Sequence, residues 1–427
     1  MISRLMCPQA EIGTAAYRPR LLDRWLDEQL PRLPAFLLVG PRAAGKTTTA
    51  ARRAATVVRL DRPAEAAAFA ADPDAAMRGL AEPLLLDEWQ VVPEVLGALK
   101  RSVDADPRPG RFLVTGSVRA PLEGETWPGT GRLTRSVVYP MTMRERLGRL
   151  DGDTFIDRVL SGELPPDPSD SFDLRDYVEA ALTGGYPYPV LELDQVARRL
   201  WMESYMEDLF GRDVPTMEAS ATRTRDASRL RRYFEAYALN SAGTATDTTI
   251  YGAAGVDRRT AVAYEGLLED LFVVERVPAW RPNRLRRLVA APKRYLIDPA
   301  LLAAAVGVDI AGVLGDGDLL GRVIDTFVAA QLRPEIGIAK VRPRMHHLRT
   351  KGGEREVDIV LEFAGGRVIA IEAKAAAAPT AHDARHLRWL RDELGERFVT
   401  GVVFHTGPRA FELDRSIIAV PIAALWA

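Results

Sequence analysis

Short apolar runs alternate with helix-compatible stretches over residues 34–117. Four of these runs predict buried strands: Ala35–Val39, Val57–Leu60, Leu84–Leu86 and Phe112–Thr115. Regular alternation of this kind is typical of an α/β domain built on a parallel sheet. Ser136–Tyr139, which precedes Pro140, predicts one further strand. The expected fold class of this part of the chain is therefore α/β.

The pattern changes after residue 160. Residues 161–173 are rich in Pro, Asp and Ser, which indicates a linker, and 174–275 are mostly helix-compatible. From about residue 341 the pattern returns to strand, turn and strand. With 427 residues and about 150 residues per domain, we expect three domains. Their predicted bounds are 1–160, 174–300 and 315–427.

The middle segment has the outline of a winged-helix domain. Leu230–Ala254 and Arg258–Leu271 predict two or three helices that are separated by a turn at Gly255. Leu271–Pro278 and Arg294–Ile297 then predict two strands that form a hairpin.

Composition places the chain among ordinary soluble proteins. Hydrophobic residues make up 47% and charged residues 27%, which excludes a disordered, collagen-like or disulfide-scaffold chain. The formal net charge of −1 means that any contact with nucleic acid must come from a local basic patch. No uncharged stretch approaches the ~20 residues of a membrane helix, and the first residues lack the apolar core of a signal peptide. A single cysteine, Cys7, suits a reducing compartment, so we expect a cytoplasmic protein without a membrane contact.

A phosphate-binding loop is predicted between the first expected strand and a helix-compatible stretch, Lys46–Ala55. The segment GPRAAGKTT matches G-x-x-x-x-G-K-[ST], and its residues are Gly40, Pro41, Arg42, Ala43, Ala44, Gly45, Lys46, Thr47 and Thr48. Backbone N–H groups of such a loop cradle phosphate oxygens. Lys46 is expected to reach the β- and γ-phosphates of ATP, and Thr47 to ligate Mg²⁺.

Residues at the ends of two later predicted strands are candidates for the hydrolytic part of this site. The apolar run ending in Asp87 and Glu88 has the form of a Walker B strand, in which Asp87 would support Mg²⁺ and Glu88 would activate water. Thr115 and Ser117 end another strand and are candidate γ-phosphate sensors. Arg132 is a candidate arginine finger or sensor, although Arg135 is equally close and either arginine could instead be salt-bridged. Asp61, which follows the second strand, is expected to be structural.

An acid–acid–lysine hairpin is predicted near the C-terminus. Two β-branched runs flank Ala364–Gly366, and a three-residue loop there would place Asp358 opposite Glu372, with Lys374 on the same face. A two-residue loop would break this register. The acids could bind Mg²⁺, with the Ala373 carbonyl as a further ligand and Lys374 placing the attacking water. They could instead form a closed salt-bridge cluster that does not cleave.

Seven cations and no acid lie between Arg276 and Ile297. We call this set the basic strip, and its members are Arg276, Arg281, Arg284, Arg286, Arg287, Lys293 and Arg294. Trp280 and Tyr295 are interleaved with them, so the strip could contact phosphates and stack on bases of DNA or another nucleic acid. The alternative is a basic hairpin that packs on another part of the protein.

These motifs occur in an order that resembles a known family. After the P-loop, Walker B and T-G-S segments come Gly184-Gly185-Tyr186-Pro187, Arg212-Asp213, Tyr264–Phe272, Pro292–Asp298 and Glu356-Val357-Asp358. The chain resembles the bacterial and archaeal AAA-superfamily ATPases that carry a C-terminal domain of unknown function with a restriction-endonuclease-like core. The resemblance implies an AAA-type ATPase, a winged-helix-like middle and a nuclease-like end, and it identifies the D-x13-E-x-K pattern as a variant of PD-(D/E)xK. Val357 replaces the usual proline, and Asp325, on an expected helix over 321–332, stands where the family usually has Glu.

Three functions remain open at this point. The first is an ATP-hydrolysing enzyme that binds or acts on nucleic acid and has a nuclease-like end. The second is a nucleotide-dependent switch or adaptor that binds a protein partner, or a second copy of itself, without acting on DNA. The third is a nuclease in which ATP only stabilises the fold.

Overall fold

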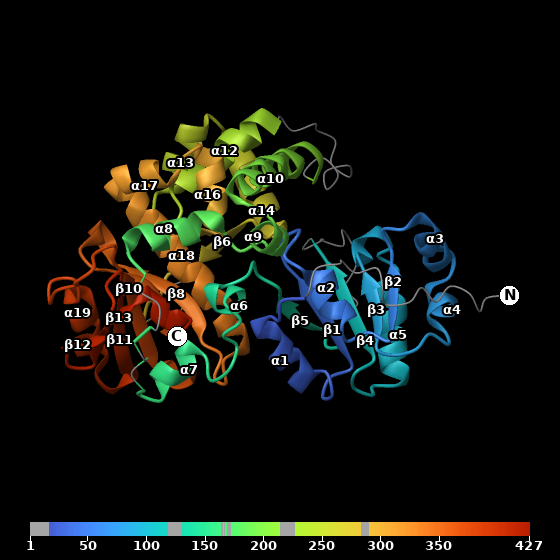
Figure 1. Ribbon diagram of the computed structural model, residues 1–427. Helices are drawn as coiled ribbons and strands as arrows, with labels where there is room; N and C mark the ends of the chain where they lie inside the picture. The colour runs from blue at the N-terminus through green and yellow to red at the C-terminus, as the bar shows by residue number, and fades with distance from the viewer. Residues whose placement is uncertain are drawn as a thin grey trace. The chain divides into compact units, whose positions relative to one another are not determined.

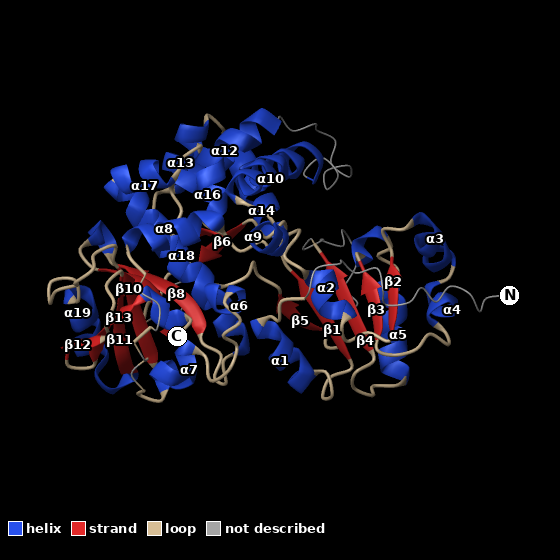
Figure 2. Cartoon of the chain, viewed as in Figure 1, coloured by secondary structure: helices blue, strands red, loops and turns tan. Residues whose placement is uncertain are grey.

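The computed structural model describes residues 17–117, 130–163, 165, 167–168, 172–213, 227–282 and 290–427. The chain divides into two compact units. The first comprises the described residues of Met1–Val39, Gly45–Val138 and Glu145–Leu150, and the second comprises those of Gly40–Ala44, Tyr139–Arg144 and Asp151–Ala427. Helices and strands are labelled in Figure 1 and coloured by type in Figure 2.

The first unit is built on a five-stranded sheet in the order β2-β3-β4-β1-β5, in which every neighbouring pair is parallel. Its strands are β1 (Ala35–Val39), β2 (Thr56–Arg59), β3 (Leu84–Asp87), β4 (Phe112–Gly116) and β5 (Thr134–Val137). Strands β1, β3 and β4 are buried along their whole length, as expected for a parallel sheet with both faces covered. The predicted parallel α/β sheet of this region is confirmed, and its strands lie within two residues of the predicted positions.

Short helices connect these strands. They are α1 (Leu21–Gln29), α2 (Lys46–Ala51), α3 (Pro63–Ala71), α4 (Pro73–Met77) and α5 (Val95–Ala105), with a 3₁₀ turn at Trp89–Val91. Proline at the first helical position begins both α3 and α4, where its missing N–H costs no intrahelical bond. The helix α6 (Met143–Arg146) crosses the boundary of the two units.

The second unit begins with helices, as the sequence predicts. They are α7 (Phe155–Leu160), α8 (Leu174–Thr183), α9 (Pro187–Glu192), α10 (Gln195–Asp208), α12 (Ala227–Leu239), α13 (Asp247–Ala254) and α14 (Arg258–Asp270), with a π-helical turn at Leu209–Asp213. Gly255 ends α13 in the left-handed conformation at φ 64°, which confirms the predicted turn. The strands β6 (Val274–Val277) and β7 (Lys293–Leu296) then pair in antiparallel fashion. The helices α16 (Ala300–Val306), α17 (Ile310–Gly315) and α18 (Gly317–Ile338) follow.

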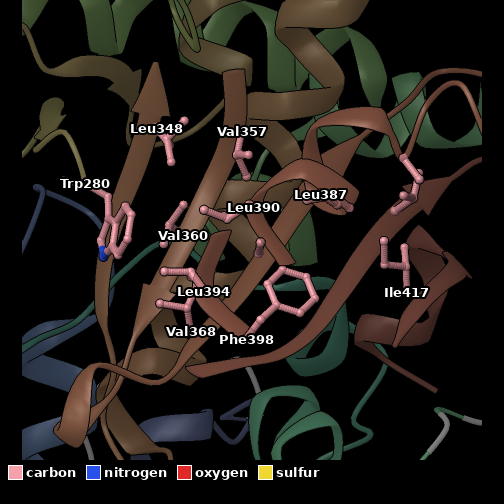
Figure 3. Packing of buried hydrophobic residues seen from close by; sticks show 13 residues of the cluster. Trp280, Leu348, Val357, Val360, Val368, Leu387, Leu390, Leu394, Phe398 and Ile417 are labelled. Atoms are coloured by element: carbon pink, nitrogen blue, oxygen red, sulfur yellow. The ribbon is translucent and has the colours of Figure 1, made fainter. Parts of the chain in front are cut away.

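A six-stranded mixed sheet ends the chain, in the order β12-β13-β11-β10-β9-β8. Its strands are β8 (Arg344–Arg349), β9 (Glu356–Glu362), β10 (Val368–Ala373), β11 (Phe398–His405), β12 (Phe411–Asp414) and β13 (Ile417–Pro421). The helix α19 (Arg385–Leu394) buries Leu387, Leu390 and Leu394 in a cluster that also contains Val360 and Phe398 (Figure 3). This apolar face fixes α19 on the sheet.

The register of the predicted C-terminal hairpin is confirmed. Strands β9 and β10 pair with Val368 opposite Glu362 and Ile371 opposite Ile359, and Phe363 N–H donates to the Arg367 carbonyl at 2.8 Å. Extending this register by one pair places Glu372 opposite Asp358.

Across the described part of the chain, no helix combines the length and the apolar character needed to span a bilayer.

Candidate functional site

The P-loop Gly40–Thr47 connects β1 to α2, as its sequence predicts. Gly45 has a φ of 92° directly before the first residue of α2, a conformation that glycine adopts without steric cost. Ala43 also has a positive φ, 60°. Lys46, the first residue of the helix, is 4% exposed. A loop that turns sharply into a helix start presents successive backbone N–H groups, which is the arrangement that binds phosphate.

Two threonine side chains contact Asp87, at the carboxyl end of β3. The Thr47 hydroxyl donates to Asp87 Oδ1 at 2.7 Å, and the Thr115 hydroxyl, from the end of β4, donates to the same oxygen. Burial raises the pKa of Asp87, and the hydrogen bonds from Thr115 and Thr47 offset part of that rise. Ligands bind at the carboxyl ends of strands in open α/β sheets, and β1, β3 and β4 end here.

This donor set fits Mg²⁺. Thr47 and Asp87 offer a hydroxyl and a carboxylate oxygen that already lie within hydrogen-bonding distance, and Mg²⁺ takes one or two protein oxygens together with substrate phosphates and water. A bound Mg²⁺ would neutralise phosphate charge at the site.

Glu88 is held by two neighbouring side chains. Ser117 Oγ donates to Glu88 Oε1 at 3.2 Å, and the Gln90 amide donates to Glu88 Oε2. Glu88 itself lies in the left-handed region at φ 56° and ψ 50°, which a non-glycine residue adopts only at a cost. Gln90 Oε1 is buried and has no hydrogen-bond partner. A strained backbone with a doubly held carboxylate is typical of a functional position.

Gln90 was not identified from the sequence. The sequence feature connected with Gln90 is Gly116, the glycine of the T-G-S segment. A Cβ at Gly116 would lie 2.5 Å from Trp89 Nε1 and 2.8 Å from Gln90 Oε1. The glycine of the predicted sensor segment therefore lets the Trp89-Gln90 turn approach the end of β4.

Arg132, the predicted finger or sensor, forms an ion pair with Asp104 of α5, with Nε 2.8 Å from Oδ1. Its side chain is 36% exposed. This pairing is the salt-bridged alternative that the sequence left open, so the structure does not bring Arg132 to Asp87 or Glu88. Asp61 is exposed in the turn after β2.

The second candidate cluster lies on the C-terminal sheet and contains a cation that was not expected there. Lys374 Nζ lies 2.6 Å from Glu372 Oε2. Asp358, opposite Glu372, instead contacts Lys293 of β7, with Nζ 2.9 Å from Oδ1. The same Lys293 ammonium lies 2.6 Å from Asp325 Oδ2, and it is 1% exposed.

This arrangement pairs the acids of the predicted metal site at Asp358 and Glu372 with lysines, and metal binding there stays a prediction. A lysine ammonium lies against the acid that was expected to bind Mg²⁺, and Lys374, expected to place water, is paired with Glu372. Among the described residues, no group of three or more His, Cys, Asp or Glu side chains could hold a metal ion. The closed salt-bridge cluster is the alternative that the structure shows.

Charge and burial set the pKa values in this cluster. Burial disfavours the charged form of Lys293, but the charges of Asp325 and Asp358 outweigh it, so its pKa lies well above the usual value. Burial acts against ionised Asp358 as well, yet Lys293 and Lys374 lower its pKa to about 2. Burial and the Asp358 charge raise the pKa of Asp325 to about 6 and that of Glu372 well above the usual value.

Three members of the basic strip are paired with acids, and two of them, Lys293 and Arg294, are also buried. Lys293 contacts Asp325 and Asp358 as described. Arg294, 1% exposed, contacts Glu265 at 3.1 Å and also Asp247. Arg276 contacts Glu265 at 3.3 Å and Glu269 at 3.0 Å. Arg284, Arg286 and Arg287 lie outside the described residues, and the nucleic-acid contact of the basic strip stays a prediction.

Two of the motifs that carry the family resemblance meet in the fold. The Gly185 N–H donates to Asp298 Oδ2 at 2.7 Å. A Cβ at Gly184 would lie 2.8 Å from Asp298 Oδ1, and one at Gly185 would collide with the Met141 carbonyl oxygen. The glycine pair and Asp298 therefore have a packing role. The side chains of Arg212 and Asp213 lie outside the described part.

Three regions of the chain match known protein families. Residues 33–147 match a family model described as an AAA domain. Residues 174–311 and 320–425 match two different models, each described as a domain of unknown function (DUF8612 and DUF4143). The match over the first region supports the P-loop ATPase domain that the segment Gly40–Thr47 predicts. The restriction-endonuclease-like character of the last region and the winged-helix character of the middle stay predictions.

The chain is similar over most of its length to two uncharacterized proteins, one from Mycobacterium bovis and one from Mycobacterium tuberculosis. Each is 27% identical over 424 residues, which cover 98% of this chain and 86% of the relative. Among solved structures, the Walker-type ATPase PABY2304 of Pyrococcus abyssi matches with a TM-score of 0.37 and 14% identity, over 66% of this chain and 94% of that one.

Proposed function

We propose that this protein binds ATP with Mg²⁺ at Gly40–Thr47 and hydrolyses it, with Glu88 as the general base. The observation that carries the proposal is the meeting of Thr47, Thr115 and Asp87 at the ends of neighbouring strands, next to the doubly held Glu88. The AAA-domain match over residues 33–147 supports nucleotide binding in general.

Each residue has a distinct task in this function. Lys46 neutralises β- and γ-phosphate charge, and Thr47 and Asp87 supply oxygen ligands for the metal. Glu88 accepts a proton from the attacking water, and Ser117 and Gln90 fix the orientation of its carboxylate. Thr115 holds Asp87 in place.

Lys46→Ala tests the nucleotide site. The variant should lose tight ATP binding, because it lacks the ammonium that neutralises the charge of the β- and γ-phosphates. Lys100→Ala, which removes a lysine from the surface of α5, is the matched control and should bind ATP as the unaltered chain does. Equal ATP affinity for all three proteins, measured by equilibrium dialysis, would refute the assignment.

Binding of nucleic acid is the second part of the proposal, and it rests on Arg284, Arg286 and Arg287. Replacing all three with alanine should weaken binding about equally for unrelated DNA sequences and flatten its salt dependence. An unchanged slope would favour the alternative, a nucleotide-dependent adaptor for a protein partner. Phosphodiester cleavage is not part of the proposed function, because Lys293 and Lys374 form ion pairs with the acids that would hold a metal.

A further inference from the structure

A buried lysine joins two carboxylates from different parts of the chain. Lys293 comes from β7, Asp325 from α18 and Asp358 from β9. Its ammonium lies 2.6 Å from Asp325 Oδ2 and 2.9 Å from Asp358 Oδ1. These are distances typical of charge-assisted hydrogen bonds.

The remaining carboxylate oxygens are also occupied. Asp358 Oδ2 accepts the Ala373 N–H at 3.1 Å, and Asp325 Oδ1 accepts the Tyr295 hydroxyl at 3.3 Å. All four oxygens of the two acids therefore have a protein donor. A divalent cation that bound between the two acids would have to displace the Lys293 ammonium, because two positive charges at this position would repel each other.

Local structure explains why Lys293 points into this cluster. Residues alternate between the two faces of a strand, so Lys293 and Tyr295 share one face of β7 and Arg294 lies on the other. Lys293 and Tyr295 contact Asp325, whereas Arg294 contacts Glu265 and Asp247. The strand thus fixes the ammonium between α18 and β9.

The charges alternate along the cluster. Asp325, Lys293 and Asp358 follow one another by contact, and Lys374 lies 2.6 Å from Glu372, the residue in register with Asp358. A single 1%-exposed ammonium balances two acids that would otherwise repel each other in a buried setting. A divalent cation would perform the same task with oxygen ligands.

We propose that the Lys293 ammonium permanently occupies the position that a divalent cation would take between Asp325 and Asp358. Lys293 thereby links β7 to the C-terminal sheet, and its ammonium replaces a metal ion there. The proposal is independent of ATP hydrolysis at the P-loop. It implies a latent site: removing the ammonium leaves Asp325 and Asp358 as hard oxygen ligands for Mn²⁺, Ca²⁺ or a lanthanide ion.

Lys293→Met tests the latent site, because methionine keeps most of the side-chain length and removes the charge. The experiment uses the full chain without nucleotide. Every variant also carries Asp87→Asn, so that metal binding at the P-loop does not contribute to the measurements. Urea unfolding with and without Mn²⁺ is measured beside Tb³⁺ luminescence, which Tyr295 can sensitise through its contact with Asp325.

We expect no effect of Mn²⁺ on the urea midpoint when Lys293 is present. Lys293→Met should lower the midpoint, because a buried carboxylate pair loses its counter-ion, and saturating Mn²⁺ should restore about half of the loss or more. Tyr295-sensitised Tb³⁺ luminescence should appear only in Lys293→Met and disappear again on adding Asp358→Asn. If folded Lys293→Met shows neither a Mn²⁺-dependent rise of the urea midpoint nor Tyr295-sensitised Tb³⁺ luminescence, the proposal is overturned.

Two measurements keep the test decisive if Lys293→Met does not fold. Lys293→Met with Asp325→Asn removes one charge of each sign and should fold without a response to Mn²⁺. With Lys293 in place, Tb³⁺ luminescence should be the same with and without Asp358→Asn. A Tb³⁺ signal, or Mg²⁺-dependent nicking of DNA, that is lost in Asp358→Asn would show that a metal binds despite Lys293 and would refute the proposal.

Discussion

Arg294 offers a direct test of whether the paired cations of the basic strip are structural. Its guanidinium contacts Glu265 at 3.1 Å, the Ala245 carbonyl at 2.9 Å, and Asp247. Arg294 is 1% exposed and the Glu265 side chain 5% exposed. Arg294→Met keeps the apolar stem and removes all three of these polar contacts.

The expected loss follows from what the substitution leaves behind. Glu265 would keep only Arg276, which lies at 3.3 Å and has a side chain 47% exposed. Removing one partner of a buried ion pair costs about 3–5 kcal/mol, because the remaining charge stays buried. Arg276→Met leaves the Arg294–Glu265 pair intact, and half-exposed pairs contribute about 0–1 kcal/mol. The two variants should therefore differ by at least about 2 kcal/mol.

Urea unfolding of the two variants and of the unaltered chain measures this difference. Adding Glu265→Gln to Arg294→Met should recover part of the loss, because the uncompensated buried charge is then gone. The salt dependence of DNA binding should be the same in Arg294→Met as in the unaltered chain, provided that the variant is folded at the assay temperature. If Arg294→Met and Arg276→Met lose equal stability, or if Arg294→Met flattens the salt slope, Arg294 is not the structural cation described here.

Two further predictions concern single side chains. Gln90→Ala should lower kcat for ATP by about tenfold or more with KM unchanged, because Glu88 loses one of its two donors and positioned general bases contribute ~10²–10⁴-fold. Gln90→Asn should recover part of the rate, and Gln195→Ala on α10 should have no effect. A normal kcat for Gln90→Ala would refute the role. Burial raises the pKa of Glu335 to about 7, and Arg144 offsets only part of that rise. Glu335 therefore stays protonated in the folded protein at pH values at which it ionises in the unfolded chain. The free energy of unfolding should rise as the pH falls from about 7 to about 5. Glu335→Gln should flatten this rise by up to about 1.4 kcal/mol per pH unit, and identical slopes for the two proteins in urea unfolding would contradict the assignment.

Local patterns in the sequence predicted the parallel sheet of the first unit, one helix end and one hairpin of the second. The buried runs of the parallel sheet, the turn at Gly255 and the register around Ala364–Gly366 all follow from residues close together in the chain. The register placed Asp358 opposite Glu372 because a strand has a period of two and the loop length fixes the pairing.

The identity of the partner in each ion pair could not be predicted in the same way. Lys293 lies far from Asp358 in the sequence, and its neighbours are arginines, so the sequence left open whether it contacts nucleic acid or packs on another part of the protein. Only the packing of β7 against α18 and β9 turns it inward. Gln90 was missed for a related reason, since its contact with Glu88 depends on the left-handed turn at Glu88.

ATP hydrolysis by Glu88→Gln is the measurement that bears most directly on the account as a whole. The amide cannot accept the proton of the attacking water, whereas Lys46, Thr47 and Asp87 are unchanged. We expect Glu88→Gln to bind ATP with Mg²⁺ as tightly as the unaltered chain and to release phosphate at least about a hundredfold more slowly. Phosphate release at the same rate in both proteins, from preparations that bind ATP equally, would contradict the assignment of this site.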